Sequence, residues 1–202
     1  MAVVRTLASV TRVEMPRVSG SRFIADASPV ADETTARAFI AQVADEFPDA
    51  THHCWAWRLD DGRTRAYDAG EPAGTAGEPI LRRLVGADLH GVVIVVSRWF
   101  GGTKLGTGGL VRAYGESAAT VLSASTIIET RVCRPLSLTF AYDWSGPIQG
   151  VLTAYALAPT SSEYGEDVRL VVQVPVETAD AFIHDLRERT AGRIVVDVVA
   201  PT

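Results

Sequence analysis

The stretch GVVIVVSRWFGGTKLGTGGLVRAY, residues Gly91–Tyr114, decides the fold of this chain. Its first part, Gly91–Ser97, is continuously apolar, which is typical of a strand buried on both faces. A glycine-rich connection follows, and from about Leu110 to Ala124 apolar residues recur at helical spacing. A buried strand that runs through glycines into a helix indicates an α+β domain in which helices cover a sheet.

Upstream of this stretch, strand-like and helical segments alternate. A helix is predicted after Asp32, since apolar residues recur there at three- and four-residue spacing up to Phe47. Asp32 is its expected N-cap, with Thr35 at the third helical position. The other elements expected in this half are strands at Ser21–Ala27, Thr51–Leu59 and Thr64–Tyr67 and a helix at Ile80–Val85, opened by a capping box of Thr75 and Glu78.

The composition changes near Glu129–Arg134, and a second set of elements follows. Strands are expected at Leu136–Tyr142, Ser161–Tyr164, Val168–Val174 and Arg193–Val198, with helices at Ile148–Leu157 and Ala179–Arg189. The order βαββαβ is the ferredoxin-like pattern. We therefore predict two domains, residues 1–130 and 131–202.

Composition and charge limit the classes of function. Of the 202 residues 47% are hydrophobic, no apolar run reaches membrane-span length, and no signal peptide is evident. The two cysteines, Cys54 and Cys133, are expected to be free thiols in a reducing cytoplasm. The net charge of −5 argues against nonspecific binding of nucleic acid, yet Arg82–Arg112 carries five cations and one anion, a local charge of +4. An anionic partner would meet one basic stretch.

The glycine-rich connection is the first candidate site. A strand that feeds a glycine loop and a helix can present backbone N–H groups and a helix dipole to an anion. The run GGTKLGTGG matches neither the phosphate loop of nucleotide hydrolases nor the dinucleotide-binding pattern. The candidate anion- or RNA-binding residues are Arg98, Trp99, Gly101, Gly102, Lys104, Gly106, Gly108, Gly109 and Arg112. The alternative is structural: the glycines supply positive φ and close strand–helix packing.

Two further segments could carry chemistry. In His52-His53-Cys54, strand alternation places His53 on the opposite face from its neighbours, and no second His/Cys pair exists to complete a metal site, so no metal or cofactor is expected. The turn residues Glu71, Pro72, Gly74, Thr75 and Gly77, with Asp68, are expected to form turns and caps. In the alternative, Glu71 and His53 serve as acid and base. The aromatic rings of Trp99 and Phe100 beside Arg98 either stack on RNA bases or fill a core.

Four segments together resemble the IMPACT family in its short bacterial, YigZ-like form. They are SRFIA (Ser21–Ala25), ATHHCWAW (Ala50–Trp57), GEPAGTAGEPIL (Gly70–Leu81) and SRWFGGTKLGTGGLVRAY (Ser97–Tyr114). The resemblance is strong over Ser21–Ala124 and looser over Arg134–Val199. It implies a first domain similar to the second domain of ribosomal protein S5. It implies a ferredoxin-like second domain similar to one in elongation factor G.

The resemblance also sets the expected function. Eukaryotic relatives look like regulators of translation that act on a starvation-response kinase pathway, but they carry an additional N-terminal interaction domain that this sequence does not show. What remains is a non-enzymatic binding protein associated with translation or its regulation, with RNA or ribosome-associated proteins as partners. Two alternatives stay open: a hydrolase or transferase acting on a phosphorylated small molecule, and a module that binds only proteins.

The sequence departs from the family pattern at two places. The family usually has two aspartates before its Gly-Glu-Pro, whereas here Asp68 is followed by Ala69, which makes a metal site at this turn less expected. The aromatic residue after Arg98 is commonly tyrosine, and Trp99 replaces its hydroxyl with an indole N–H.

Overall fold

The computed structural model describes residues 3–199, and the chain divides into two compact units. The N-terminal unit is Val4–Thr130, and the C-terminal unit begins at Arg131. Each unit has its own sheet and its own apolar core, so the protein is a mixed α/β structure. No helix within residues 3–199 combines the length and the apolar composition that a membrane span needs.

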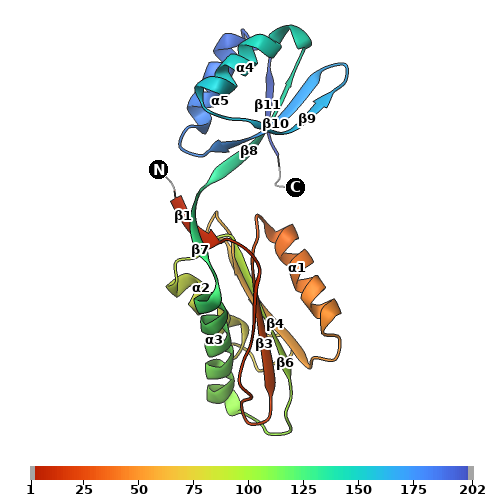
Figure 1. Ribbon diagram of the computed structural model, residues 1–202, viewed down its shortest axis with the longest axis vertical. Helices are drawn as coiled ribbons and strands as arrows, with labels where there is room; N and C mark the ends of the chain where they lie inside the picture. The colour runs from red at the N-terminus through yellow and green to blue at the C-terminus, as the bar shows by residue number, and fades with distance from the viewer. Residues whose placement is uncertain (1–2, 200–202) are drawn as a thin grey trace. The chain divides into compact units, whose positions relative to one another are not determined.

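A five-stranded antiparallel sheet forms the centre of the N-terminal unit (Figure 1). Its strands, in spatial order, are β2 (Thr11–Glu14), β3 (Arg22–Pro29), β6 (Val92–Trp99), β4 (His52–Arg58) and β5 (Thr64–Tyr67). A separate two-stranded sheet joins β1 (Val3–Leu7) to β7 (Ile127–Arg131).

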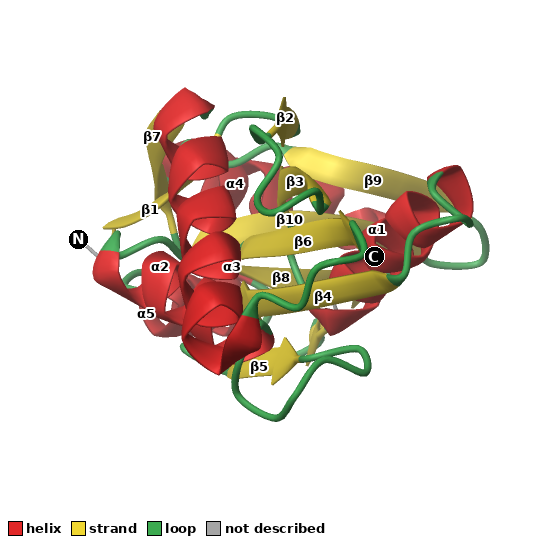
Figure 2. Ribbon diagram, turned by 90° about the horizontal axis from the view of Figure 1, so that it is seen from below, coloured by secondary structure: helices red, strands yellow, loops and turns green. Residues whose placement is uncertain are grey.

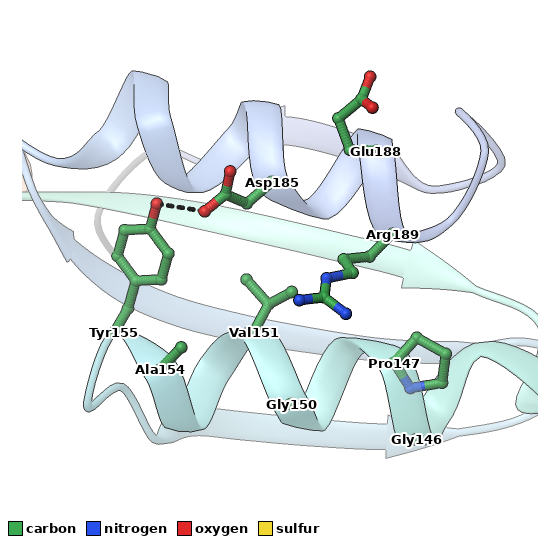
Figure 3. A pocket seen from close by; sticks show the side chains of 9 residues that line it. All are labelled: Gly146, Pro147, Gly150, Val151, Ala154, Tyr155, Asp185, Glu188 and Arg189. Atoms are coloured by element: carbon green, nitrogen blue, oxygen red, sulfur yellow. Dashed lines mark hydrogen bonds between the residues drawn. The ribbon is translucent and has the colours of Figure 1, made fainter.

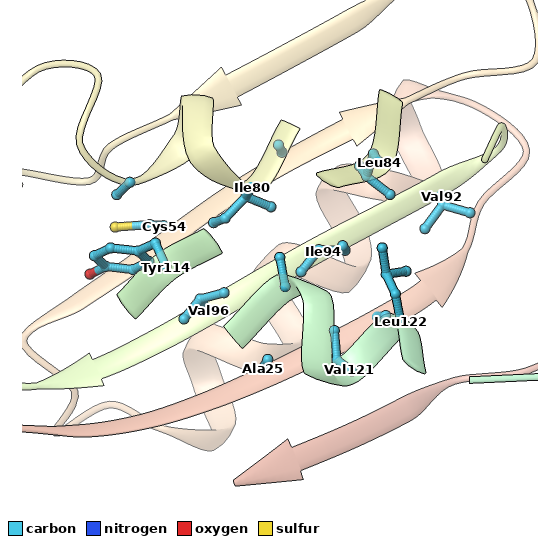
Figure 4. Close-up of a cluster of buried hydrophobic side chains, with 14 of the residues drawn as sticks. Ala25, Cys54, Ile80, Leu84, Val92, Ile94, Val96, Tyr114, Val121 and Leu122 are labelled. Carbon is cyan, nitrogen blue, oxygen red and sulfur yellow. The ribbon is translucent and has the colours of Figure 1, made fainter. Parts of the chain in front are cut away.

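Helices cover both faces of this sheet. The helix α1 (Glu33–Glu46) lies on one face, and α2 (Gly77–Gly86) and α3 (Gly106–Ala124) lie on the other (Figures 1 and 2). The central strand β6 therefore contacts helices with alternate side chains. Val92, Ile94 and Val96 pack with α2 and α3 (Figure 4), while Val93 and Val95 pack with α1. The predicted strand buried on both faces is confirmed.

The start of α1 is also as predicted. The Asp32 carboxylate accepts a hydrogen bond from the Thr35 amide at 2.7 Å. The Thr35 hydroxyl oxygen accepts one from the Asp32 amide at 3.1 Å. Each residue thus satisfies an N–H group that the helix itself leaves without an acceptor.

The start of α2 differs from the prediction, because Thr75 and Glu78 form no capping box. The Thr75 hydroxyl donates to the Pro72 carbonyl at 2.6 Å. The cap comes instead from Asp68, whose carboxylate accepts the amides of Gly74, Ala76 and Gly77 at 2.8–3.0 Å. A side chain nine residues before the first residue of the helix therefore replaces the local pattern.

The helix α3 begins at Gly106, four residues before the predicted start near Leu110. Glycine has low helix propensity, so the sequence predicts a loop for the run Gly106-Thr107-Gly108-Gly109. Tertiary packing of the long apolar face that follows extends the helix backward through these residues. The consequence is that the glycines form the first turn of α3.

The C-terminal unit has the predicted order βαββαβ. Its antiparallel sheet has the spatial order β11 (Val195–Val198), β8 (Cys133–Phe140), β10 (Val168–Pro175), β9 (Pro159–Tyr164). After the short 3-10 turn Tyr142–Trp144, the helices are α4 (Ser145–Ala154) and α5 (Ala179–Arg189). Side chains of both helices, including Ile148, Leu152, Phe182 and Leu186, share one core with alternate residues of β8 and β10.

Candidate functional site

A buried ion pair joins the turn before α2 to the end of β6. The Arg98 guanidinium donates from Nη1 to Glu71 Oε1 at 2.5 Å, and the two side chains are only 5% and 4% exposed. Arg98 also donates from Nη2 to the Ser21 hydroxyl oxygen at 3.2 Å, which accepts the Gly101 amide at the same distance. The network therefore connects the end of β6 with Ser21, just before β3, and with the glycine-rich connection.

Tyr114 of α3 completes this network. Its hydroxyl donates to Glu71 Oε1 at 2.7 Å, and its ring lies edge-on to Phe23 at 5.5 Å between centroids. Burial, together with neighbouring Cys54 and Glu71, holds the pKa of the Tyr114 hydroxyl far above its ordinary value. Tyr114 is therefore a neutral donor, and Glu71 is the acceptor for both Tyr114 and Arg98.

A cavity of about 390 Å³ lies beside the network. It brings together charged, aromatic and apolar side chains with the backbone at the start of α3. The residues that line it are His52, Glu71, Pro72, Arg98, Phe100, Lys104, Leu105, Gly106, Thr107 and Leu110. Arg98 and Lys104, expected to face a common partner, do line the same cavity.

The N-terminus of α3 opens on this cavity. Leu105 occupies the N-cap position and provides no side-chain hydrogen bond. Among the described residues, the amides of Gly106, Thr107 and Gly108 donate no hydrogen bond to a side chain or to a backbone outside the helix. Helix N-termini carry a partial positive charge and N–H groups without an intrahelical acceptor. Together with Lys104, this end of α3 can hold an anion.

His52, a member of the candidate segment His52-His53-Cys54, lines the cavity. Its Nδ1 lies 2.9 Å from the Ala69 carbonyl oxygen, which can only accept, so Nδ1 carries the hydrogen. The other nitrogen, Nε2, is 3.9 Å from Glu71 Oε1 at the cavity. Strand alternation had already placed His52 with Cys54 on one face of β4, and that was the available signal.

His53 lies on the opposite face of β4, as alternation predicted. Its Nδ1 is 2.9 Å from the Ser97 hydroxyl oxygen, and burial lowers the pKa of the imidazole. His53 therefore does not meet Glu71. The alternative acid–base pair of His53 and Glu71 is wrong, because the side chains of neighbouring strand residues point to opposite faces.

The basic stretch does not form one surface. The Arg98 guanidinium is buried against Glu71 and does not face solvent, contrary to expectation, because the carboxylate compensates its charge inside the protein. Arg82 and Arg83 line a separate groove with Leu122, between α2 and α3. Arg112 is exposed on α3 but does not line the cavity. Lys104 is therefore the exposed cation of the cavity.

The two aromatic residues after Arg98 have different surroundings. Trp99 packs edge-on against Phe47 at 5.4 Å, and the Arg22 guanidinium lies 4.6 Å from its ring centroid. Phe100 is 48% exposed and lines the cavity, with the Arg98 guanidinium 5.7 Å from its centroid. Phe100 can stack on a ligand, whereas Trp99 belongs to a packed cluster.

The glycines differ in what requires them. A Cβ on Gly101 would lie 1.9 Å from the Gly20 carbonyl carbon, and one on Gly77 would lie 2.5 Å from the Tyr67 amide, so both are required by packing. Gly102, Gly106 and Gly74 adopt positive φ, and a Cβ on Gly109 would lie 3.1 Å from the Leu105 Cβ. Gly108 is different: its φ is not positive, and its Cβ would meet nothing within 4 Å.

Metal chemistry has no geometric support in the part of the chain that the structure describes. Within residues 3–199, no three His, Cys, Asp or Glu side chains are grouped so that they could hold an ion. Burial raises the pKa of the Cys54 thiol to about 12, so this thiol is also a poor nucleophile.

A second pocket, of about 380 Å³, lies in the C-terminal unit between α4 and α5 (Figure 3). Gly146, Gly150 and Ala154 line it from α4, and its charged side chains come from α5. These are Asp185, Glu188 and Arg189, two acids and one base. The Tyr155 hydroxyl donates to Asp185 at 2.7 Å. Because acids outnumber bases in this pocket, the cavity at the start of α3 is the better site for an anion.

Comparison with known proteins places this chain among relatives of matching length. Residues 19–122 match the Impact N-terminal domain, and residues 138–193 match a domain of unknown function, DUF1949. The chain is 35% identical to IMPACT family member YvyE of Bacillus subtilis (87% of this chain, 82% of that one). It is also 35% identical to IMPACT family member YigZ of Escherichia coli (93% of each).

A solved structure described only as that of a hypothetical protein is similar over the full length of both chains, with a TM-score of 0.74 and 30% identity. The family match covers the strands and helices that build the cavity, from β3 through most of α3. The chain belongs to the IMPACT family.

Proposed function

We propose that this protein is a non-enzymatic binding protein of the cytoplasm, associated with translation or its regulation, which holds RNA at the cavity beside α3. The observation that carries the proposal is the meeting of Lys104 with the unpaired amides of Gly106 and Thr107 in one cavity. Phosphate oxygens are the natural ligands of such a helix start. Phe100 adds an exposed ring on which a base can stack.

The proposal extends to the fold names. The N-terminal unit, a sheet with two helices on one face, supports a likeness to the second domain of ribosomal protein S5. The βαββαβ unit supports a ferredoxin-like assignment. Ribosome-associated proteins or RNA are the proposed partners, reached by the N-terminal unit.

Fluorescence anisotropy with single-stranded RNA at several salt concentrations tests the proposal. We expect weak binding that decreases as salt rises, since phosphate contacts release counterions. Lys104→Ala removes one contact, so the affinity falls and the salt slope decreases by about 1. Arg82→Ala is the matched control, because it removes an equal charge from a different groove. An unchanged affinity and slope in Lys104→Ala contradict the proposal.

A further inference from the structure

We infer that the Glu71 carboxylate in the cavity beside α3 recognises the 2′-hydroxyl of a ribose, so that RNA binds there in preference to DNA. The inference rests on the proposed function and names the chemical group that the same site distinguishes. In that function Lys104 meets phosphate, which RNA and DNA share. Glu71 meets the hydroxyl, which is the group in which the two nucleic acids differ.

One oxygen of the Glu71 carboxylate has no partner in the protein. Arg98 Nη1 and the Tyr114 hydroxyl both donate to Oε1, whereas no residue within 3–199 donates a hydrogen bond to Oε2. The side chain is only 4% exposed, yet Oε2 is not among the polar atoms that are fully buried without a partner. Because Glu71 lines the cavity, this is where Oε2 meets solvent.

A carboxylate oxygen in such a place favours a ligand that carries a hydrogen-bond donor. If the ligand excludes water and offers no donor, the oxygen loses its hydration without compensation. The oxygens of a phosphodiester cannot compensate it, since they only accept hydrogen bonds and carry the same sign of charge. A phosphate attracted by Lys104 therefore leaves Oε2 unsatisfied, and another group of the same ligand has to donate to it.

The charges of the lining favour a neutral donor over a cation. Arg98 compensates the charge of Glu71 across 2.5 Å, and Lys104 adds a second positive charge to the lining. An ammonium or guanidinium group would bring a third positive charge and would be repelled. A hydroxyl group donates to a carboxylate and brings no charge.

Among neutral donors, the ribose hydroxyl suits a single free oxygen. The Watson–Crick edge of guanine offers two neighbouring N–H donors, which suit a carboxylate with both oxygens free, but Oε1 of Glu71 already accepts two hydrogen bonds. The 2′-hydroxyl has one hydrogen to donate and lies on the sugar, between base and phosphate. With a base stacked on Phe100, which is 48% exposed, and a phosphate at Lys104, the sugar is the part left for Glu71.

His52 adds a second acceptor to the lining. Since Nδ1 carries the hydrogen, Nε2 of the neutral ring accepts, and it lies 3.9 Å from Glu71 Oε1. The ring is 20% exposed, so water can donate to Nε2. The cavity thus combines acceptors at Glu71 and His52 with a donor at Lys104. A ribonucleotide has a phosphate that accepts and a sugar hydroxyl that donates, whereas a deoxyribonucleotide lacks the hydroxyl.

The test changes the ligand and leaves the protein intact. Anisotropy measures the affinity of four uridine oligonucleotides of equal length, which carry a hydroxyl, a fluorine, an O-methyl group or a hydrogen at the 2′ position. Base and phosphate charge are the same in all four, and the fluorine keeps the sugar conformation of RNA but cannot donate. We expect the hydroxyl form to bind about tenfold or more tightly than each of the others, because they leave a charged acceptor unsatisfied.

Glu71→Gln assigns this preference to the carboxylate. Arg98 and Tyr114 both donate at the position of Oε1, so the glutamine has to place its carbonyl oxygen there and its NH₂ group, a donor, at the position of Oε2. The variant should bind the hydroxyl and fluorine forms about equally. Glu116→Gln is the matched control, because it makes the same change of charge on an exposed residue of α3 outside the cavity. It should keep the preference.

The outcomes separate the inference from the proposed function. Equal affinity for all four forms, with Lys104→Ala weakening each of them, overturns the inference and leaves the proposed function standing. A Glu71→Gln variant that folds, as thermal unfolding shows, and keeps the preference for the hydroxyl also overturns the inference. If Glu71→Gln does not fold, the four ligands decide with the unmodified protein alone. Absence of binding of every form at low salt overturns both proposals.

Discussion

The Arg98 guanidinium and the Glu71 carboxylate meet at 2.5 Å, with neither side chain more than 5% exposed. They are 27 residues apart and come from different elements, so the contact joins the end of the central strand to the turn that precedes α2. Both residues also line the cavity. The same pair therefore stabilises the fold and forms a wall of the proposed site.

Relative to the sum of its two single losses, the double variant that removes both Arg98 and Glu71 should lose less free energy of unfolding. Arg98→Met or Glu71→Leu leaves a buried charge without its partner and should lower the free energy of unfolding by about 3–5 kcal/mol. The double variant should lose less than the sum of the two, because no unpaired charge remains. Urea denaturation of the four proteins measures this.

The exposed pair of Arg63 and Asp61 provides the control for that experiment. The same kind of cycle at this pair should show coupling of at most about 1 kcal/mol, since solvent screens exposed charges. Additive losses at Arg98 and Glu71 would show that the buried contact has no special role in stability.

Asp68 predicts a pH dependence of stability. Burial opposes its ionisation, but the amides of Gly74, Gly77 and Ala76 outweigh burial, so its pKa in the folded protein is lowered. The stability it contributes is therefore fully present above its unfolded pKa of about 3.9 and is lost as the pH falls through the lower folded value. Asp68→Asn should cost about 1–2 kcal/mol at pH 7, and this cost should shrink below about pH 4.

Denaturation from pH 7 to pH 3 checks the expectation for Asp68. The exposed Asp167 offers a control, and Asp167→Asn should leave the curve nearly unchanged. A difference between Asp68→Asn and the unmodified protein that stays constant over the whole pH range would rule out this source of acid sensitivity.

The glycines of α2 predict opposite effects of one substitution. Gly77→Ala places a Cβ 2.5 Å from the Tyr67 amide nitrogen, so the backbone must move and the protein should lose about 1–3 kcal/mol. Gly86→Ala meets nothing and should be neutral or stabilising by about 0.4–1 kcal/mol. Thermal unfolding of both variants compares them, and similar melting temperatures would refute the close approach at Gly77.

The two thiols should differ in reactivity. Burial raises the pKa of Cys54 to about 12, and its Sγ donates to the Asp68 carbonyl at 3.0 Å, so almost no thiolate is present at pH 8. Cys133 is only partly buried. A disulfide reagent should modify Cys133 alone in the native protein and Cys54 only after denaturation. Rapid labelling of a Cys133→Ser variant under native conditions would contradict this.

Local patterns predicted much of the fold. The bounds of β5 and α5 were read directly from the sequence, since alternation and helical spacing are properties of neighbouring residues. The same holds for the cap at Asp32. The predicted cap at Thr75 was wrong because the acceptor, Asp68, lies outside the local motif.

The candidate site was less predictable for a related reason. Lys104 and the glycines were found because they form one continuous run, but Tyr114 and Glu71 are 43 residues apart and meet only through folding. Alternation predicts that His52 and His53 lie on opposite faces of β4, but it does not predict which of the two faces meets the start of α3. The sequence therefore names His52 in a candidate segment without placing it at the cavity, and it predicts an exposed Arg98 although a carboxylate far away in sequence compensates its charge.

The central position of β6 has a consequence for synthesis of the protein on the ribosome. Its two neighbours, β3 and β4, are made first, yet neither pairs with the other, since each pairs with β6. Until Trp99 has left the ribosomal tunnel, both strands therefore have open edges, the arrangement most prone to incorrect pairing between chains. A nascent chain whose Val92 is still inside the tunnel should need a chaperone, whereas one whose Ala124 has already emerged can close the sheet of the N-terminal unit.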